Sequence, residues 1–290
     1  RTMILIADSG STKTTWVGVE HAKEFFRKDR GGLNPVIQSH DEIEREVEQL
    51  AMNVACEGCV VEAIYFYGAG CNAMFVGVME ELLKRYFGEN VKMEVNSDLL
   101  GAARAVCGNT DGVACILGTG SNSCLFLNGE IVQNTPALGF ILGDEGSGAD
   151  LGKRFLNGIL KGSLPQSIRD EFLEEYELSV ATIISKVYKE AMPNRFLASF
   201  APFIKSHLHE KAVRELVVEA FVQYLQRNIT PYKRADLGLG VVGSIGYHFQ
   251  NELKEAADRL QLKIAKIIKA PIEELVNYHI ETQKQHFCNI

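Results

Sequence analysis

Apolar positions follow two periods along the chain, and these periods predict strands that alternate with helices. Short apolar runs between turn residues predict strands, and apolar residues spaced by three and four predict amphipathic helices. The predicted strands cover 3–7, 15–19, 63–67, 91–95, 112–117, 122–127, 130–132, 237–242 and 262–267, and the predicted helices cover about 41–55, 74–87, 98–107, 150–161, 165–176, 178–191, 196–207, 210–228, 247–259 and 271–284. This alternation is typical of an α/β protein.

Two polar turns between predicted strands share one plan. The turn at 8–15 and the turn at 118–122 are rich in Ser, Thr and Gly, and they lie about a hundred residues apart. Backbone N–H groups and hydroxyls at such tips can converge on a phosphate, although an ordinary polar hairpin tip is the alternative. Asp8 could hold Mg²⁺, and Lys13 adds a cation. The repeated hairpin indicates two similar domains with a nucleotide between them.

Asp98 lies where a predicted strand ends and a helix starts. Loops at this edge of an α/β sheet commonly carry the chemistry, so Asp98 is a candidate catalytic residue. Its alternative role is an N-cap of the helix, for which Asp is well suited. For the helix at 41–55 the pattern predicts a cap at Ser39 or Asp41. Asn128-Gly129 predicts a two-residue hairpin turn.

Composition excludes several classes of function. The 290-residue chain is 46% hydrophobic and 23% charged, and its net charge of −7 provides no basic field for nucleic acid or an anionic membrane. The sequence shows neither an apolar run of about 20 residues nor a signal-peptide pattern. Seven cysteines, mostly in predicted strands and helices, favour reduced thiols and a cytoplasmic location.

Several motifs of other protein classes are absent or incomplete. The sequence has neither the Walker pattern of P-loop kinases nor the Gly-x-Ser-x-Gly elbow of serine hydrolases. Cys56 and Cys59 form one CxxC pair, whereas tetrahedral zinc needs four ligands. His207 and His209 would face different sides of a helix. Residues 68–73 match a dinucleotide fingerprint, but a tight strand-to-helix turn is favoured because they lie well inside the domain.

The turns together resemble those of a known superfamily. The turn at 8–15 resembles the phosphate 1 loop of the sugar kinase, Hsp70 and actin superfamily, and Gly118-Thr-Gly-Ser-Asn122 resembles its phosphate 2 loop. Leu142-Gly-Asp-Glu-Gly-Ser-Gly148 is similar to the N-acetylglucosamine kinase branch of the BadF/BadG/BcrA/BcrD ATPase group. The chain has Leu138-Gly-Phe140 where that family usually has Gly-Trp-Gly, so the acceptor sugar and recognition of its N-acetyl group stay open.

The resemblance implies a role for each matching position. It implies ATP-dependent phosphorylation of a hydroxyl of an amino sugar, most simply N-acetylglucosamine, with Asp98 as the base and Mg²⁺ held by Asp8. The implied nucleotide contacts are Ser9, Gly10, Ser11, Thr12, Lys13, Gly118, Thr119, Gly120 and Ser121, with Gly243 and Ser244 in an adenosine-binding turn. The implied sugar contacts are Asn34, Asp98, Thr119, Gly139 and Asp144.

The resemblance also implies the architecture and the partners. It implies two ribonuclease-H-like domains of the actin-like ATPase fold with an interdomain nucleotide cleft. We expect one domain at 1–108, with the helix at about 271–290 packing back on it, and the other at 109–270. The expected partners are the sugar and ATP, with a homodimer left open, and neither nucleic acid nor a membrane is expected.

Two alternative functions remain at the level of sequence. One is an ATP-driven activator of a dehydratase, which would hold an iron–sulfur cluster at a dimer interface through Cys56 and Cys59. The Gly143–Gly148 loop speaks against it. The other is an ATP-binding regulator without sugar turnover, which the altered sequence around Phe140 leaves open.

Overall fold

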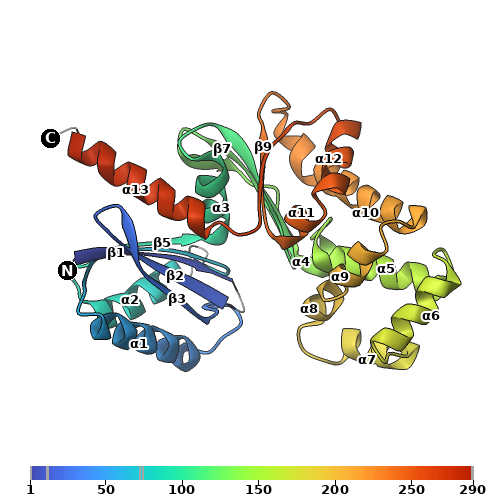
Figure 1. The fold of residues 1–290 in the computed structure, drawn as a ribbon, viewed down its shortest axis with the longest axis horizontal. Coiled ribbons are helices and arrows are strands. Elements are labelled where there is room, and N and C mark those ends of the chain that lie inside the picture. Colours follow the sequence, from blue (N-terminus) through green and yellow to red (C-terminus); the bar gives the residue numbers. More distant parts are fainter. Residues whose placement is uncertain (1, 11–12, 72, 74, 289–290) are drawn as a thin grey trace. The chain divides into compact units, whose positions relative to one another are not determined.

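The chain divides into two compact units. The structure is a computed structural model that describes residues 2–10, 13–71, 73 and 75–288. Unit 1 comprises residues 1–108 and 271–290, and unit 2 comprises residues 109–270. Unit 2 is therefore inserted between two segments of unit 1 (Figure 1). Each unit contains one five-stranded sheet, which confirms the predicted α/β class.

The unit 1 sheet has the order β3-β2-β1-β4-β5. Its strands are β1 (Thr2–Ser9), β2 (Lys13–Glu20), β3 (Lys23–Gly31), β4 (Val60–Gly68) and β5 (Lys92–Ser97). The first three strands form an antiparallel meander, and β4 and β5 run parallel to β1. The carboxyl ends of β1, β4 and β5 consequently lie at one edge of the sheet.

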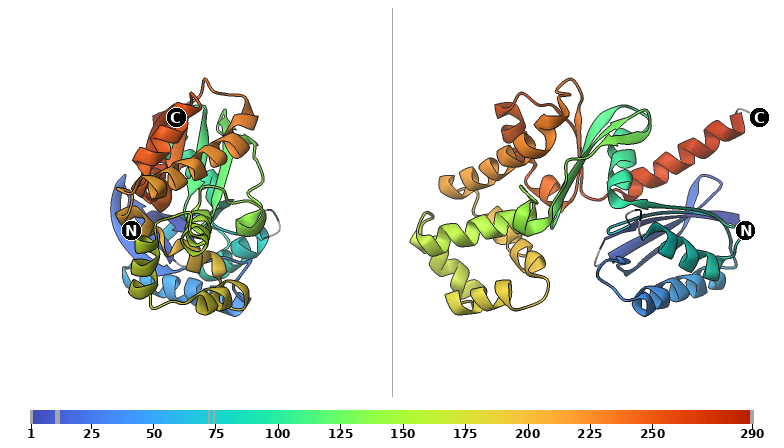
Figure 2. Two further views of the ribbon diagram at one scale, coloured as in Figure 1. Left: turned by 90° about the vertical axis from the view of Figure 1, so that its right-hand side faces the viewer. Right: turned by 180° about the vertical axis from the view of Figure 1, so that it is seen from behind.

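Helices cover both faces of this sheet. They are α1 (His40–Cys56), α2 (Val76–Phe87), α3 (Asp98–Cys107) and α13 (Ile272–Cys288). Figure 1 and the rear view in Figure 2 show α1 and α2 on one face and α3 and α13 on the other. The α1 helix begins with a capping box in which Ser39 accepts from Glu42 N and Glu42 accepts from Ser39 N. This confirms one of the two predicted caps.

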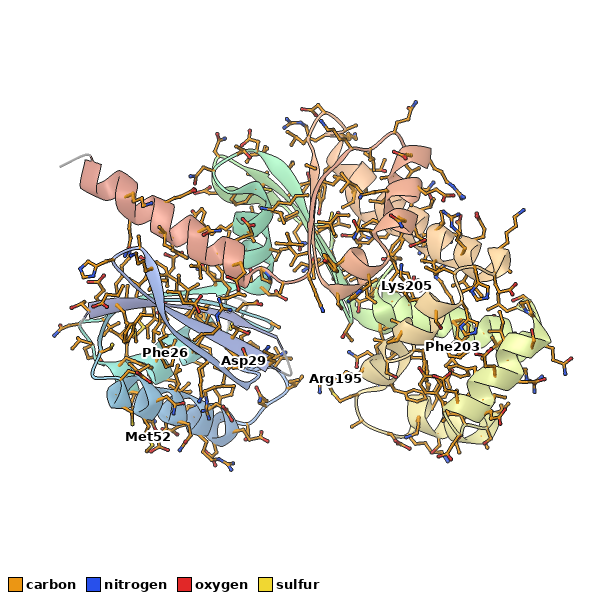
Figure 3. The ribbon with its side chains drawn as sticks, in the orientation of Figure 1. Phe26, Asp29, Met52, Arg195, Phe203 and Lys205 are labelled. Atoms are coloured by element: carbon orange, nitrogen blue, oxygen red, sulfur yellow. The ribbon has the colours of Figure 1, made fainter. Side chains whose placement is uncertain are left out.

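Strand β3 was not predicted from the sequence. Its burial pattern does not alternate cleanly, because Phe26 is its only fully buried residue and most of the others are exposed (Figure 3). Charged side chains such as Glu24 and Arg27, which pair at 2.7 Å, occupy its exposed positions. Charges on an edge strand hinder pairing with other chains, and they also remove the apolar signal of a strand.

The unit 2 sheet has the order β10-β9-β6-β7-β8. Its strands are β6 (Gly112–Leu117), β7 (Ser121–Leu127), β8 (Glu130–Gln133), β9 (Leu239–Val242) and β10 (Ile264–Ile268). The turn between β7 and β8 has positive φ at Asn128 (53°) and Gly129 (82°), as a type I′ hairpin requires. The predicted two-residue turn is therefore confirmed.

The remaining helices belong to unit 2. They are α4 (Gly139–Leu142), α5 (Gly148–Lys161), α6 (Gln166–Glu175), α7 (Val180–Tyr188), α8 (Pro193–Ala198), α9 (Ala201–Ser206), α10 (Lys211–Tyr224), α11 (Ser244–His248) and α12 (Gln250–Arg259). The sequence predicted one helix where α11 and α12 are separated at Phe249. Phe155, Phe172 and Phe203 pack together among the helices, and their ring centroids are 5.2–5.7 Å apart.

A π-helical turn, Leu225–Ile229, follows α10. A 3₁₀ turn, Thr230–Tyr232, comes directly after the π turn. Pro231 has no backbone N–H and cannot continue the α-helical hydrogen bonds, which accounts for the change at this point. The sequence predicted an ordinary helix to residue 228. Of the helices in the described part of the chain, none is both long and apolar enough to cross a bilayer.

Candidate functional site

Two carboxylates meet at the carboxyl edge of the unit 1 sheet. The register pairs Ser9 of β1 with Gly68 of β4, and Gly68 with Ser97 of β5. Asp8 is the residue before Ser9 on β1, and Asp98 is the residue after Ser97 on β5. Strands are about 4.8 Å apart, so the two carboxylates share an edge that is only two strand spacings wide.

The environment of this edge favours a bound cation. Burial, followed by the charge of Asp98, raises the pKa of Asp8 to about 7, and Lys13 acts in the opposite direction. Burial also raises the pKa of Asp98 to about 6, against hydrogen bonds from the N–H groups of Asp98 and Leu99. A divalent cation here would offset the repulsion between the carboxylates and restore their charged forms. Oxygen ligands on partly buried carboxylates thus fit Mg²⁺.

Asp98 is the first residue of α3 and is not its cap. The cap is Ser97, whose Oγ accepts a hydrogen bond of 3.2 Å from Leu100 N. The capping role that the sequence allowed for Asp98 is therefore wrong. Its carboxylate still benefits from the positive end of the α3 dipole.

The first turn is fastened to the loop that follows β3. Ser9 Oγ lies 2.7 Å from Thr14 Oγ1, accepts from Leu33 N at 3.0 Å and lies 3.2 Å from Leu33 O. Because these contacts use the hydroxyl of Ser9, its side chain positions the turn and does not offer a further hydrogen-bond donor to a phosphate. Gly10 N donates to Lys13 O at 2.9 Å, and Lys13 Nζ pairs with the exposed Asp29 at 2.8 Å (Figure 3). The predicted contacts Ser11 and Thr12 lie outside the described residues.

Asn34 lies in the loop that Ser9 holds. Asn34 is buried, its Oδ1 accepts from Val36 N at 3.0 Å, and its own N–H donates to Gln38 Oε1 at 2.6 Å. Gly70 has a φ of 76°, and a Cβ there would lie 2.2 Å from Asn34 Oδ1. Glycine at position 70 therefore lets the turn after β4 reach the Asn34 side chain. The loop and the turn together hold Asn34 near the same edge as Ser9.

The second turn, between β6 and β7, is closed by backbone hydrogen bonds. Gly118 N donates to Gly120 O at 3.0 Å. The start of α5 is attached to the same turn, because Gly148 N donates to Gly118 O at 2.8 Å and Ala149 N donates to Thr119 O at 3.1 Å. The turn is thereby fixed between two strands and the beginning of a helix.

Asp144 connects the loop before α5 to this turn. Its Oδ1 accepts from Ser121 N at 3.0 Å, and a Cβ on Gly120 would lie 3.0–3.2 Å from its carboxylate. Asp144 has a left-handed backbone, with a φ of 53°. Burial raises the pKa of Asp144 despite the hydrogen bond from Ser121. Gly139, also a predicted sugar contact, is the first residue of the short α4, with a φ of 72°.

The third glycine turn lies against the second. A Cβ on Gly243 would lie 2.2 Å from Leu117 O and 3.2 Å from Gly118 N, so only glycine permits this approach. Next to Gly243, Ser244 lines a cavity of about 630 Å³ that lies within unit 2. The lining residues are Thr119, Ala198, Ser199, Ala201, Pro202, Lys205, Ser206, Ser244, Ile245, His248, Phe249 and Lys269.

This cavity joins two of the predicted nucleotide turns, through Thr119 and Ser244. Its apolar lining with a few cationic and hydroxyl groups is typical of a site for a small molecule. Lys205, on α9 in Figure 3, lies 5.5 Å from the Phe249 ring centroid. The contribution of α8 and α9 was not predicted, because their apolar spacing was assigned to core packing. Among the described residues, no group of three or more potential ligands is arranged to hold a metal ion.

The solved structures that resemble this chain include one with substantial sequence identity. The structure of a "putative N-acetylglucosamine kinase" from Porphyromonas gingivalis is 44% identical, with a TM-score of 0.92 over 97% of this chain and 100% of that one. The chain belongs to the N-acetylglucosamine kinase-like family. The recognition drawn from the phosphate turns and the Leu142–Gly148 segment is thereby confirmed.

More distant structures show the fold alone. A "putative N-acetylglucosamine kinase" from Chromobacterium violaceum is 15% identical to this family member, with a TM-score of 0.74 over 96% of this chain and 98% of that one. MreB 5 of Spiroplasma citri, solved with AMPPNP, is 11% identical, with a TM-score of 0.60 over 99% and 98% of the two chains. These matches confirm the actin-like ATPase fold. Neither a protein-family model nor a curated protein matches the chain.

Proposed function

We propose that this protein transfers the γ-phosphoryl group of ATP to a hydroxyl of an amino sugar, with N-acetylglucosamine as the first candidate. Family membership supports the proposal, since the relative from P. gingivalis carries that kinase name. The observation that carries it is the pair of partly buried carboxylates, Asp8 and Asp98, at the carboxyl edge of the unit 1 sheet. Phosphoryl transfer needs a base, alignment and charge neutralisation, and this edge supplies the first and helps with the last.

Asp98 takes the proton from the attacking sugar hydroxyl in this proposal. A pKa of about 6 leaves it mostly ionised at neutral pH yet basic enough to accept a proton as the new bond forms. Asp8 would hold Mg²⁺, which when bound neutralises charge on the phosphates. Asn34 orients the sugar from the same unit, and its Oδ1 is already fixed by Val36 N.

The glycine turns of unit 2 bind ATP in this proposal. Residues 118–121 direct backbone N–H groups at the phosphates, and Gly243 and Ser244 accommodate the nucleoside beside the 630 Å³ cavity. Lys13 and the first turn contribute to the phosphates from unit 1. Asp144 contacts the sugar, together with Thr119 and Gly139, and its hydrogen bond to Ser121 N links sugar recognition to the phosphate turn.

A coupled ADP-release screen across amino sugars and their N-acyl derivatives tests the reaction. We expect turnover with N-acetylglucosamine that depends on both ATP and Mg²⁺. Hexoses without the 2-amino substituent are the control, and we expect them to react at least tenfold more slowly. An absence of sugar-dependent ADP release across the whole panel, from protein that binds ATP, would contradict the kinase proposal.

Gly120→Val tests whether the second turn binds phosphate. A side chain at Gly120 would enter the space of the Asp144 carboxylate and block close approach to the turn, so we expect ATP affinity to fall at least tenfold. Gly77→Ala in α2 is the control, since its Cβ would meet no neighbouring atom within 4 Å and Gly77 lies outside the glycine turns. Calorimetry should separate the two variants. Equal, unchanged ATP affinity in folded G120V would show that the turn does not hold phosphate.

A further inference from the structure

The loop from Gly143 to Gly148 carries Asp144, and the side chain of the next residue faces α10 and its π-helical end. Glu145 Oε2 accepts from Asn228 Nδ2 at 3.2 Å, and Glu145 Oε1 accepts from Arg227 Nη1 at 3.3 Å. Burial acts to raise the pKa of Glu145, but hydrogen bonds from its own N–H, from Asn228 and from Arg227 lower it overall. The carboxylate is therefore held in its charged form by these donors.

Of the two side chains that donate to Glu145, Asn228 is the buried one. Asn228 is 5% exposed, whereas the Arg227 side chain is 63% exposed, so water screens the ion pair much more than the amide contact. Asn228 Nδ2 also donates to Tyr224 O at 3.1 Å, and Asn228 O accepts from Thr135 Oγ1 at 2.9 Å. The side chain and carbonyl are thus fixed from three directions. Single π-helical turns are rare in proteins and frequently lie at functional sites.

Glu145 lies between two residues whose backbones are in the left-handed region. Asp144 has a φ of 53° and Gly146 a φ of 70°. A Cβ on Gly146 would lie 2.9 Å from Tyr224 Cβ, which shows how closely the loop approaches α10. A left-handed Asp costs free energy and persists only when surrounding contacts maintain it. The Glu145–Asn228 contact is one of these.

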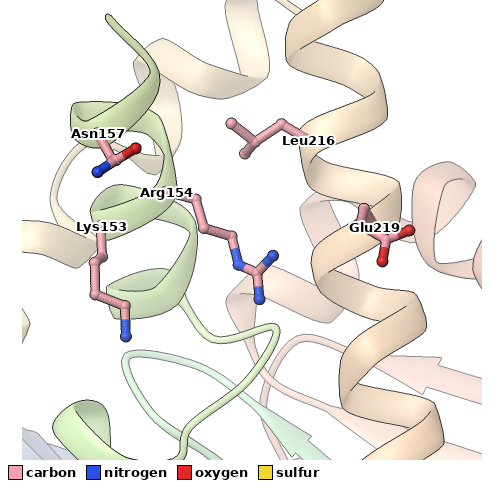
Figure 4. Close-up of a pocket in the computed structure, with 5 residues that line it drawn as sticks. All are labelled: Lys153, Arg154, Asn157, Leu216 and Glu219. Carbon is pink, nitrogen blue, oxygen red and sulfur yellow. The ribbon is translucent and has the colours of Figure 1, made fainter. Parts of the chain in front are cut away.

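A second attachment to α10 lies at the start of α5. Gly146 N donates to Asp150 Oδ2 at 2.9 Å, and the same oxygen accepts from Arg154 Nε at 2.9 Å. Arg154 Nη2 in turn donates to Gln223 Oε1 on α10 at 2.7 Å. Figure 4 shows Arg154 extending from α5 toward α10, beside Glu219, where it lines a cavity of about 350 Å³. This attachment holds the loop at Gly146, whereas Glu145 holds it at the residue next to Asp144.

We propose that Asn228 is a positioning residue for sugar recognition: its amide holds Glu145, and Glu145 holds the loop so that Asp144 stays on Ser121 N. Asn228 does not touch the substrates and acts only through the loop. The assignment of the sugar to Asp144 rests on the proposed kinase function. The assignment of Asn228 to the loop rests only on contacts within unit 2.

A donor–acceptor exchange tests the contact. Asn228→Asp places a carboxylate against Glu145 and should raise the sugar KM at least tenfold, while the ATP KM changes less than threefold. In the double variant N228D/E145Q a side-chain amide faces the new carboxylate in the reverse sense, so we expect the sugar KM to return part of the way to the wild-type value; the bond to Tyr224 O is not restored. Gln226→Glu adds the same charge at an exposed position of the same π turn and should leave both KM values unchanged. Glu145→Ala, a second variant that removes the acceptor, should reproduce the N228D effect.

Hydrogen–deuterium exchange tests the Glu145–Asn228 contact without an activity assay. The amide of Gly146 donates to Asp150 Oδ2 on α5 at 2.9 Å, and the amide of Ser147 donates to Asp144 O within the loop at 3.1 Å. We expect both to exchange at least tenfold faster in N228D or E145A, and to be protected again in N228D/E145Q, while the amides of β6 stay unchanged. Unchanged exchange in the single variants, or no recovery in the double variant, overturns the role of Asn228. Failure of wild-type turnover overturns the kinase proposal alone.

Discussion

Two clusters of ionisable side chains lie in the same unit and differ in what surrounds them. Glu94 on β5 and Asp98 at the start of α3 are only four residues apart. Glu94 accepts from Arg104 Nη1 at 2.6 Å and from Asn96 Nδ2 at 3.0 Å. Burial would raise the pKa of Glu94, but these donors lower it overall, whereas the pKa of Asp98 is raised to about 6 by burial. The two carboxylates lie in one short segment, but their pKa values are shifted in opposite directions.

The cluster around Glu94 joins the C-terminal helix to the sheet. Arg104 Nη1 also donates to Tyr67 Oη at 2.6 Å, and Tyr67 Oη lies 2.8 Å from His279 Nε2 on α13. The His279 ring stacks on Tyr65 with centroids 3.9 Å apart. The charges of Glu94 and Arg104 are paired within the protein, so the cluster stabilises the fold. At Asp8 and Asp98 burial raises both pKa values, and the charge of Asp98 adds to the rise at Asp8, which is typical of groups arranged for a ligand.

Replacing Asp98, the proposed base, should give the largest effect. We expect Asp98→Asn to lower kcat by about 10²–10⁴-fold, because an amide cannot accept the hydroxyl proton. Ser97 still caps α3, and the variant removes a charge that burial disfavours, so the free energy of unfolding at pH 7.5 should stay equal or rise. Steady-state kinetics and urea unfolding measure the two quantities. A kcat within a few-fold of wild type would remove Asp98 from the mechanism.

Replacing Glu94 should have the opposite pattern of effects, with a loss of stability and little change in kcat. Glu94→Gln weakens the bond to Arg104 and leaves a partly buried guanidinium without its counter-charge, which should lower the free energy of unfolding by about 1.5–3 kcal/mol. We expect kcat within threefold of wild type. Because Glu94 lies so close to Asp98 in sequence, E94Q is the matched control for D98N. Loss of activity without loss of stability in E94Q would show that the two clusters are not separate in function.

The smallest expected effect is on the pH dependence of stability. Burial and Arg104, with a smaller effect from Lys92 and against Glu94, lower the pKa of His279 from 6.5 to about 4. The unfolded chain therefore binds a proton at a higher pH than the folded one, and acidification favours unfolding. His279→Gln removes this group and keeps an amide that can hydrogen-bond to Tyr67. Between pH 7.5 and 5.5, wild type should lose about 1 kcal/mol more stability than H279Q in urea titrations. If the free energies of unfolding of wild type and H279Q changed with pH in parallel, the lowered pKa of His279 would be contradicted.

Local signals were sufficient for much of the fold. The Ser39 cap and the Asn128-Gly129 turn depend on residues within three positions of one another, and both were predicted from the sequence. Strand β3 was missed because its charged, exposed positions conceal the alternation. The π turn before Pro231 was missed because proline signals an interruption without specifying which helix type precedes it.

Long-range contacts at the candidate site could not be predicted. The sequence selected the glycine turns, but nothing near Glu145 indicates that Asn228, more than eighty positions away, donates to it. The same holds for the cavity lining from α8 and α9, and for the bonds that occupy the Ser9 hydroxyl. Such pairs depend on where helices pack against a sheet, which periodicity alone does not determine. The roles of the turns and of Asp98 stay predictions.

The insertion of unit 2 into unit 1 has a consequence for how the protein is made. A ribosome adds about 5–20 residues per second, so the segment from 109 to 270 takes on the order of 10–30 s to synthesise. During that time α3 and the sheet of unit 1 exist without α13, and Tyr67 and Arg104 lack His279. Unit 2 is a continuous segment and can fold first. The nascent chain can therefore form the glycine turns of unit 2 before α3, which begins at Asp98, is anchored by α13.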